Sequence, residues 1–341
     1  MTQVRQSNIE LLRIVAMFMV MMLHVNNTAL GLPTTEDAQT AILPTLTRIF
    51  FELLSIGSVN VFVLISGWFG IRFSWKSLTT FIFQCVFITW GMLLVMVCFG
   101  FVPLTLRNLD VNLFVRSWFV QAYLGLYLLA PALNLLIENN KKRHSQIVIG
   151  LFLLELFYDF LSPSEPLFKA GYSTMHFVLL YMIARYVKLY GVFSFVRKWS
   201  FCLFLLTVVG GTVVQFIGIQ HGIASIFWIG VYSSPVVVFA ALCLLLSFLK
   251  LNLQNNFVNK VAVASFAVYL LHTNPLVLSD YFMKGAIEIY HNSVGFIYLI
   301  CICLYMIAWY VLAIVVDFVR QFVWCQLSPL IENLYEKRKL D

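Results

Sequence analysis

Long apolar runs constrain this chain more than any other feature of its sequence. Residues 81–101 and 293–316 contain no charged side chain, and about 20 apolar residues in a helix match the roughly 30 Å hydrocarbon core of a bilayer. Only 11% of all residues are charged and 61% are apolar, whereas about a quarter of a soluble domain is charged. The sequence therefore predicts an all-α, polytopic transmembrane helix bundle and excludes an ordinary water-soluble fold.

A membrane-length window moved along the chain predicts about ten helices, of which the fifth has the weakest signal. No linker, low-complexity tract or convincing internal repeat interrupts them, so we expect one transmembrane domain over residues 1–341. The absence of a repeat weighs mildly against the inverted-repeat architecture of many transporters. The ten helices are expected to begin near Ile9, Arg48, Ser77, Trp118, Gln146, Ser173, Ser200, Ala224, Val261 and Ser293.

The distribution of basic residues predicts the orientation of the bundle. An even number of helices places both termini on one side, and 16 Lys and Arg residues fall in the segments on that side against five on the other. Because cytoplasmic loops carry the excess of Lys and Arg, both termini are expected to be cytoplasmic. The net charge of +7 is spread over short loops rather than gathered in a patch, which argues against a nucleic-acid partner.

Two ionisable residues interrupt the first apolar segment, Arg13 and His24. Eleven residues make about three helical turns, so the two side chains share one face and stand roughly 16 Å apart along the axis. With the N-terminus inside, Arg13 lies near the cytoplasmic leaflet, where it could meet an anion, and His24 lies in the outer third, where a neutral imidazole could act as a general base. Alternatively, Arg13 only snorkels to the interface and His24 is a satisfied structural histidine.

The second helix has distinct ends. Near its cytoplasmic end, the small residues Ser66 and Gly67 allow a backbone or a ligand to approach closely, and Arg72 could hold phosphates or serve only as a topology signal. At the outer end, Arg48 and Glu52 have the spacing of an intrahelical ion pair. Glu52 is also at the depth of His24, where it could orient the imidazole or contact the hydroxyl groups of a ligand. Glu155 or Asp159 of the fifth helix could do the same.

Aromatic residues mark the fourth helix at Trp118, Tyr123 and Tyr127. They suit an interfacial belt, and Tyr123 and Tyr127, four residues apart, could equally line a polar cavity. In the ninth helix, His272 precedes Pro275, where capping or packing is the simpler interpretation. The seven cysteines form no CxxC pair, so neither disulfides nor a metal site is expected, and no nucleotide-binding, redox or metalloprotease motif is present.

Four of these motifs together resemble the integral-membrane acyltransferase-3 family, whose bacterial members O-acylate surface polysaccharides and related glycans. The motifs are Arg13-x10-His24; Phe62-Val-Leu-Ile-Ser66-Gly67-Trp68-Phe69; Trp118 with Tyr123, Tyr127 and Pro131; and Tyr269-Leu-Leu-His272. Their order and spacing span most of the chain.

The resemblance implies a membrane O-acyltransferase that uses acetyl-CoA or another acyl-CoA from the cytoplasm. Arg13 and Arg72, beside Ser66 and Gly67, would then bind the donor, whose pantetheine arm reaches toward the catalytic His24. Glu52, Trp118, Tyr123, Tyr127 and His272 would contact the acceptor. The expected setting is a bacterial inner membrane, with a glycan or lipid-linked saccharide as acceptor, no metal, and homo-oligomerisation left open.

We expect His24 to remove a proton from a sugar hydroxyl that attacks the thioester, with a covalent acyl-histidine step as an alternative. A flippase or transporter of lipid-linked sugars would also need polar residues inside a helix bundle, and is the leading non-enzymatic alternative. A glycan polymerase is a third.

Overall fold

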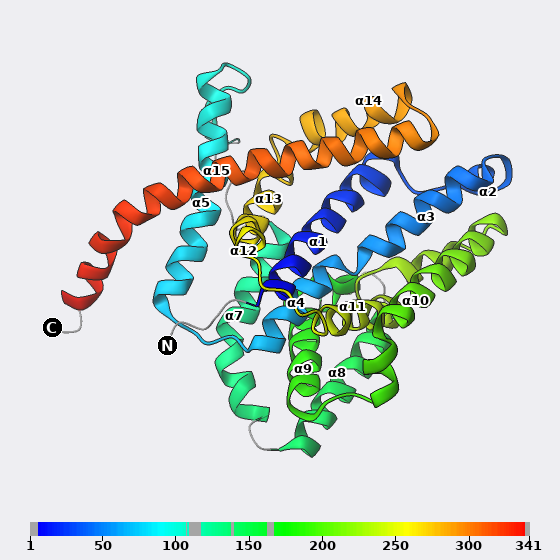
Figure 1. Cartoon of the computed structure of the whole chain (residues 1–341), viewed down its shortest axis with the longest axis horizontal. Helices are drawn as coiled ribbons and strands as arrows, with labels where there is room; N and C mark the ends of the chain where they lie inside the picture. The colour runs from blue at the N-terminus through cyan, green and yellow to red at the C-terminus, as the bar shows by residue number, and fades with distance from the viewer. Residues whose placement is uncertain (1–5, 107, 109–116, 138–139, 162–166, 338–341) are drawn as a thin grey trace. The chain divides into compact units, whose positions relative to one another are not determined.

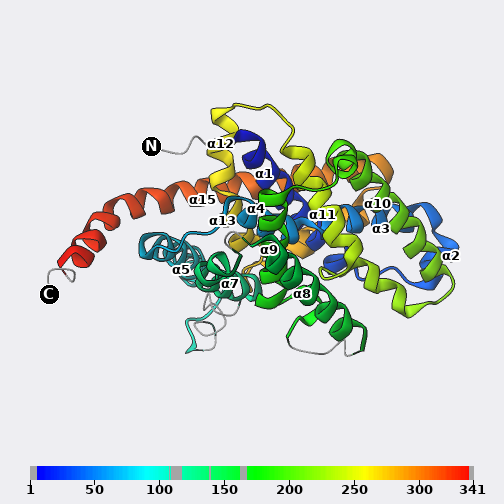
Figure 2. The same ribbon diagram turned by 90° about the horizontal axis from the view of Figure 1, so that it is seen from below.

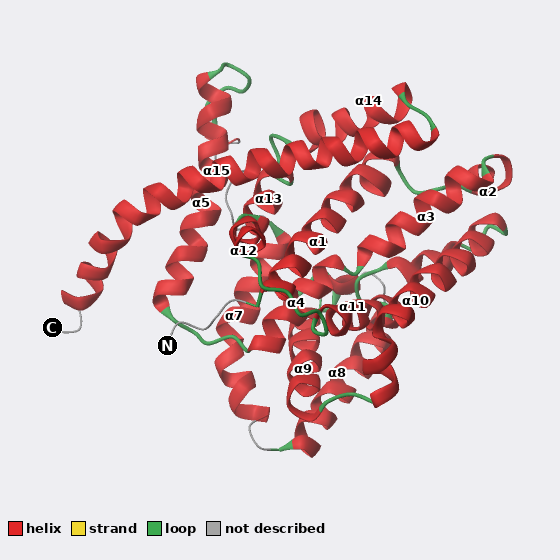
Figure 3. Ribbon diagram, in the orientation of Figure 1, coloured by secondary structure: helices red, strands yellow, loops and turns green. Residues whose placement is uncertain are grey.

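The computed structural model describes residues 6–106, 108, 117–137, 140–161 and 167–337. Within these residues the chain is helical and contains no β-strand (Figure 3). The predicted all-α transmembrane helix bundle is thereby confirmed as a fold class. The chain divides into two compact units. The first comprises Met1–Trp75 with Val115–Asn259, and the second comprises Lys76–Phe114 with Lys260–Asp341.

Seven helical segments among the described residues are long and apolar enough to cross a membrane. They are Ser7–Thr28, Ile42–Phe69, Trp75–Cys98, Trp118–Ile137, Ser194–Gln220, Ala224–Phe248 and Gly295–Pro329. The other three predicted helices are also helical: α8 (Lys141–Leu161), α9 (Thr174–Tyr190), and α12 (Asn256–Val263) with α13 (Ser265–His272). The count of ten spans and the cytoplasmic position of the termini stay predictions.

The first unit is built around a helix that bends in its middle. It consists of α3 (Ile42–Ile56) and α4 (Ser58–Phe69), which meet at Gly57. Helix α1 (Ser7–Leu23) packs on both, α9 packs on α4, and α8 packs on α9 (Figures 1 and 2). The unit also contains α7 (Trp118–Ile137), α10 (Ser194–Gln220), η4 (Ala224–Gly230) and α11 (Pro235–Phe248). Because α4 touches α1, α9 and α11, its polar residues are enclosed by protein.

Close backbone contact explains how α4 and α9 pair so tightly. A Cβ atom added to Gly67 would lie 2.7 Å from the Ala184 Cβ and 2.7 Å from the Tyr181 carbonyl oxygen. Both distances are too short for an ordinary contact, so only glycine fits. Small residues allow helices in membranes to approach in this way. Of the two roles that the sequence allowed for Gly67, the structure shows the approach of another helix backbone.

Short helices occupy two connecting segments, residues 28–47 and 278–292. In the first, α2 (Thr35–Thr40) begins with a capping box: Asp37 N donates to the Thr34 hydroxyl (3.1 Å), and Thr34 N donates to the Asp37 carboxylate (2.8 Å). In the second lie η5 (Leu278–Met283) and α14 (Lys284–Asn292).

The second unit contains α5 (Trp75–Cys98, which begins at the boundary), α12, α13, η5, α14 and the long α15 (Gly295–Lys337). Helices α13 and α14 both pack on α15. Arg320, which was counted among the charges on the side of the termini, is buried and paired with Asp317 at 2.6 Å. Gln84 and Gln321 also donate to Asp317. Arg320 is therefore neutralised inside the protein, so its charge adds little to the topology signal.

Candidate active site

His24 lies where the first helix changes its hydrogen-bond pattern. Helix α1 ends at Leu23 and continues as the π-helix η1 (His24–Thr28), in which Asn26 leaves the helical region at φ −96° and ψ −107°. The His24 side chain donates a hydrogen bond to the Val20 carbonyl. In a neutral imidazole the second ring nitrogen then carries the lone pair. The His24 side chain is half-buried, and π-helical turns often occur at functional sites.

Glu52 is attached to the same π-helical segment. The Asn26 amide donates to the Glu52 carboxylate at 2.9 Å and to the Arg48 carbonyl oxygen at 2.9 Å. The backbone and side chain of Asn27 also donate hydrogen bonds to Glu52. Glu52 thus fixes the segment that follows His24. Sequence reasoning missed Asn26 and Asn27, although two consecutive amide side chains within three residues of His24 could have indicated a polar site.

The expected Arg48–Glu52 ion pair is replaced by other contacts. Arg48 donates to the Gly31 carbonyl oxygen, while Glu52 turns toward the two asparagines. Arg48 still attracts Glu52 electrostatically. The ion pair does not form because the segment 24–31 packs on α3 and supplies other partners. These partners are the Gly31 carbonyl for Arg48 and the Asn26 amide for Glu52.

Three aromatic rings, here called the ring array, lie beside Glu52. The centroid of Trp118 is 4.6 Å from that of Tyr172 and 5.7 Å from that of Tyr232, and the two tyrosines are 4.9 Å apart. Tyr172 interacts electrostatically with Glu52 and is 42% exposed. Trp118 was predicted as a site residue, whereas Tyr172 and Tyr232 were not singled out by the sequence. We call His24, Asn26, Glu52 and the ring array the His24 end.

Tyr123 and Tyr127 lie away from the ring array, further along α7. Their Cα atoms are about 7.5 and 13.5 Å along the helix axis from that of Trp118. The Tyr123 hydroxyl is 3.2 Å from that of Ser66, and Tyr123 also interacts electrostatically with Arg13. Each turn of α7 lies at a different depth of the bundle, so Tyr123 and Tyr127 lie deeper along it than Trp118. Tyr123 therefore meets Ser66 and Arg13, which were expected to bind the donor.

Tyr181 organises that second group. Its hydroxyl accepts from Ile71 N (3.1 Å) and donates to Asn134 (2.7 Å), while the Asn134 amide donates to the Ile71 carbonyl oxygen (3.0 Å). The Tyr127 hydroxyl holds Ser74 in the same way, at 3.0 and 3.2 Å. The segment 70–74, which carries the exposed Arg72, is therefore fixed to α7 and α9.

Two further arginines belong to this group: Arg185 lies against the segment 70–74, and Arg13 interacts with Tyr123. Arg13 pairs with Glu10 at 3.2 Å through one nitrogen only, which leaves further donors on its guanidinium group. The Arg185 guanidinium lies against Gly70, and its Nε atom is buried without a hydrogen-bond partner. In the sequence, Arg185 is one of the basic residues from which the topology is predicted, and no site role is predicted for it. We call Arg13, Ser66, Arg72, Tyr123 and Arg185 the basic end.

His272 belongs to the second unit. Its Nδ1 lies 2.6 Å from the Val268 carbonyl oxygen, and its ring is 5.0 Å from that of Phe282. With 1% of its surface exposed, His272 has the environment of a packed histidine. Its assignment to the acceptor stays a prediction.

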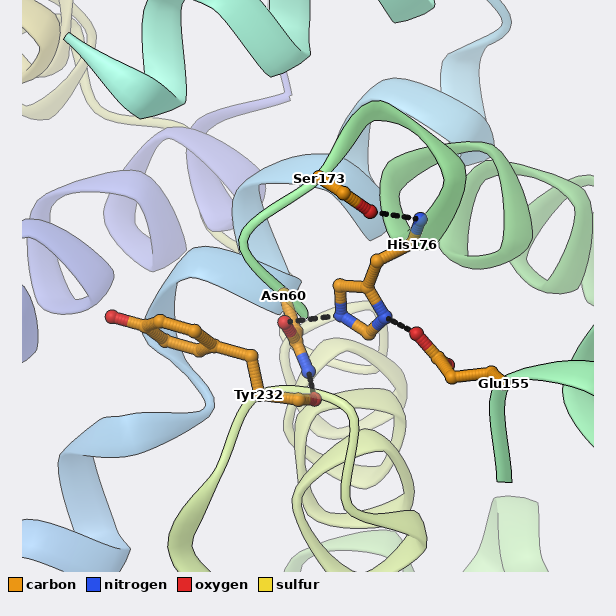
Figure 4. A network of polar contacts seen from close by, with 5 residues as sticks. All are labelled: Asn60, Glu155, Ser173, His176 and Tyr232. Atoms are coloured by element: carbon orange, nitrogen blue, oxygen red, sulfur yellow. Dashed lines mark hydrogen bonds and ion pairs between the residues drawn. The ribbon is translucent and has the colours of Figure 1, made fainter. Parts of the chain in front are cut away.

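A histidine that sequence reasoning did not identify lies at the first turn of α9. His176 Nδ1 is 2.8 Å from Glu155 Oε1, and His176 Nε2 is 3.2 Å from Asn60 Oδ1 (Figure 4). The Asn60 amide in turn donates to the Tyr232 carbonyl oxygen at 2.8 Å. The hypothesis that Glu155 orients His24 receives no support, because the partner of Glu155 is His176.

No group of three or more His, Cys, Asp or Glu side chains within the described ranges is arranged to hold a metal ion. The predicted site residues of the first unit instead form two groups, the His24 end and the basic end, and the helical segment Ser7–Thr28 and α7 each contribute residues to both. A multi-pass helical membrane protein with an enclosed polar interior is the class that this geometry defines.

The family model for the acyltransferase domain matches residues 6–315. The match covers about nine-tenths of the chain, so the protein belongs to the acyltransferase-3 family and is a multi-pass membrane acyltransferase. The resemblance seen in the sequence motifs is thereby confirmed. Comparisons with curated proteins and with solved structures gave no match.

Proposed function

We propose that this protein transfers an acyl group, most simply acetyl, from acyl-CoA at the basic end to a hydroxyl of a surface glycan or lipid-linked sugar at the His24 end. The observation that carries the proposal is the position of His24: this half-buried imidazole begins the π-helical turn that Asn26 fastens to Glu52 at 2.9 Å. The setting we propose is a bacterial inner membrane.

The chemistry needs one base and one path for the proton. The unprotonated ring nitrogen of His24 takes the proton of the acceptor hydroxyl while its oxygen bonds to the thioester carbonyl carbon. When the carbon–sulfur bond breaks, the CoA sulfur leaves as thiolate and receives that proton from the imidazolium. The products are the acyl ester and free CoA, so no further reactant is required.

The basic end suits the donor by its charge. Arg185 lies beside Tyr181 and Gly70, Arg72 belongs to the segment 70–74, and Arg13 interacts electrostatically with Tyr123. Guanidinium groups bind phosphate oxygens with paired hydrogen bonds. Arg185 Nε, which is buried without a partner, has an unused donor for such an anion.

Glu52 and the ring array suit a sugar. Pyranose rings present apolar faces to aromatic rings and hydroxyl groups to carboxylates, and ligand sites commonly combine aromatic walls with a few polar groups. The flippase alternative finds no specific support in the site and is not expected of an acyltransferase domain.

The test is donor dependence in the purified protein, reconstituted in nanodiscs with acetyl-CoA and octyl β-glucoside as the acceptor probe. We expect mass spectrometry to show a glycoside heavier by one acyl group only when both substrates are present. Calorimetry of the same samples should show saturable acetyl-CoA binding that Arg13→Ala and Arg72→Ala each weaken. A folded protein that neither binds acetyl-CoA nor acylates the probe, but moves lipid-linked sugars unchanged, would contradict the proposal.

A further inference from the structure

The buried chain Glu155–His176–Asn60 connects three helices to the turn before α11 (Figure 4). All three side chains are 0% exposed, and Glu155 and His176 are both ionisable. Ionisable groups inside a membrane domain are costly and commonly functional. Neither the general base nor the donor site uses this chain, so its role needs its own explanation.

The hydrogen-bond directions follow from one end of the chain. Asn60 donates its amide to the Tyr232 carbonyl, so Asn60 Oδ1 is the acceptor facing His176, and His176 Nε2 must carry a hydrogen. His176 Nδ1 and Glu155 Oε1 then share one proton. Imidazolium with carboxylate, or neutral imidazole with carboxylic acid, gives the same net charge of zero. In both forms His176 Nε2–H donates to Asn60, so the direction of the hydrogen bonds from His176 to Tyr232 is the same.

The fixed end of this chain is the backbone of Tyr232. On its other side, Gly171 approaches so closely that an added Cβ would lie 2.4 Å from the Tyr232 Cβ, at a positive φ of +93°. Tyr172 directly follows Gly171, so the contacts that hold Tyr232 also set the position of Tyr172. Both tyrosines and Trp118 form the ring array next to Glu52.

We propose that His176 and Asn60 are positioning residues that hold the ring array in the geometry that binds the acceptor sugar. Glu155 holds the His176 ring through Nδ1, and His176 holds the Asn60 side chain through Nε2–H. Asn60 in turn holds the backbone of Tyr232, against which the loop that carries Tyr172 packs. The assignment of the array to a sugar rests on the proposed function, whereas the mechanical connection from His176 to the array does not.

Two double variants without ionisable groups at positions 155 and 176 test whether the hydrogen bond from residue 176 to Asn60, rather than packing alone, holds the ring array. Both contain Glu155→Gln, so neither leaves a buried charge unpaired. In the first, His176→Gln places its amide nitrogen near the Nε2 position and can still donate to Asn60. In the second, His176→Asn places its amide nitrogen near the Nδ1 position and cannot reach Asn60. The two variants are alike in charge and polarity and differ mainly in this one contact.

The readout is the ¹⁹F NMR spectrum of the full chain labelled with 5-fluorotryptophan, with the Trp118 resonance assigned by Trp118→Phe. The chain has eight tryptophans, so seven resonances serve as internal controls. We expect the Gln variant to keep the wild-type Trp118 resonance and the Asn variant to shift it by more than its linewidth while the other seven stay in place. Asn60→Ala, which introduces no charge, should give the same selective shift even if the Asn double variant does not fold.

An unchanged Trp118 resonance in the Asn variant and in Asn60→Ala overturns the proposal. So does an equal movement of all eight resonances, which would assign the chain to general support of the bundle. If wild type acylates octyl β-glucoside, the Asn variant should raise KM for the glycoside about tenfold, the worth of one hydrogen bond, and leave KM for acetyl-CoA unchanged. A wild type without transferase activity would refute the proposed function but leave the NMR result to decide the connection.

Discussion

Replacing Gly67 by alanine is the sharpest test of how the first unit is packed. The added Cβ would lie 2.7 Å from both the Ala184 Cβ and the Tyr181 carbonyl oxygen, whereas ordinary contact begins at 3.4 Å. The difference, 3.4 minus 2.7, is roughly 0.7 Å. Neither neighbouring atom can turn aside by a rotamer change, so α4 and α9 must separate by about that distance.

The magnitude follows from two opposing effects. Overpacking of this kind costs about 1–3 kcal/mol, and replacing a helical glycine by alanine returns about 0.5–1 kcal/mol. We expect a net destabilisation of about 1 kcal/mol, the middle of the range that the two effects leave, which should lower the apparent Tm of the purified protein by about 1–2 °C. Differential scanning fluorimetry at a fixed scan rate measures it, because membrane proteins often unfold irreversibly.

Gly210→Ala is the matched control. Gly210 lies inside α10 in the same unit, and an added Cβ would meet no atom within 4 Å. Its apparent Tm should stay the same or rise, since only the helix-propensity gain applies. Equal melting of the two variants would show that α4 and α9 do not approach each other as described.

Three further predictions concern other parts of the chain. Tyr181→Phe removes the hydroxyl that makes two hydrogen bonds, so it should weaken acetyl-CoA binding and lower the free energy of unfolding by about 2–4 kcal/mol. Calorimetry measures the first effect and thermal melting the second, and unchanged values would refute the role of Tyr181 in holding the segment 70–74. Arg185→Ala should weaken acetyl-CoA binding at least tenfold, as expected for a charged hydrogen bond. Lys188→Ala, which removes a cation over the Trp68 ring, is the control and should leave binding unchanged. Equal effects of the two variants would contradict the proposal that the basic end binds the donor. Hydrogen bonds from the backbone and then the side chain of Thr34 lower the pKa of Asp37, so the cap should stabilise α2 above the ordinary carboxyl pKa and be lost as pH falls through the lowered pKa. Hydrogen exchange of the α2 amides should show this dependence, and Thr34→Ala should abolish it.

The sequence was sufficient to predict the elements that the bilayer itself dictates. A helix that crosses about 30 Å of hydrocarbon needs a long apolar run, so the helices near Ser77, Ser200 and Ser293 were evident. The structure has them as α5, α10 and α15. The break between α12 and α13 could not be predicted, because the apolar run that begins at Val261 continues through Ala264 without a glycine or proline.

The sequence analysis missed residues whose contacts lie on other helices. Arg13 and His24 were found because both stand on one helix, where spacing alone gives their separation. His176 and Asn60 lie 116 positions apart, and their contact depends on how α4 packs against α9. Tyr123 and Tyr127 share a helix face as expected, but which residues that face meets is decided by helix packing, and they meet Ser66 and Ser74.

The most direct test of the account is acyl transfer by His24 variants in nanodiscs, with acetyl-CoA and the acceptor probe both present. His24→Gln can still donate a hydrogen bond but cannot take a proton as imidazole does, and His24→Ala can do neither. We expect both variants to bind acetyl-CoA like wild type and to lose at least a hundredfold in kcat, the usual worth of a general base. Undiminished transfer by both variants would show that His24 is neither the base nor a covalent carrier.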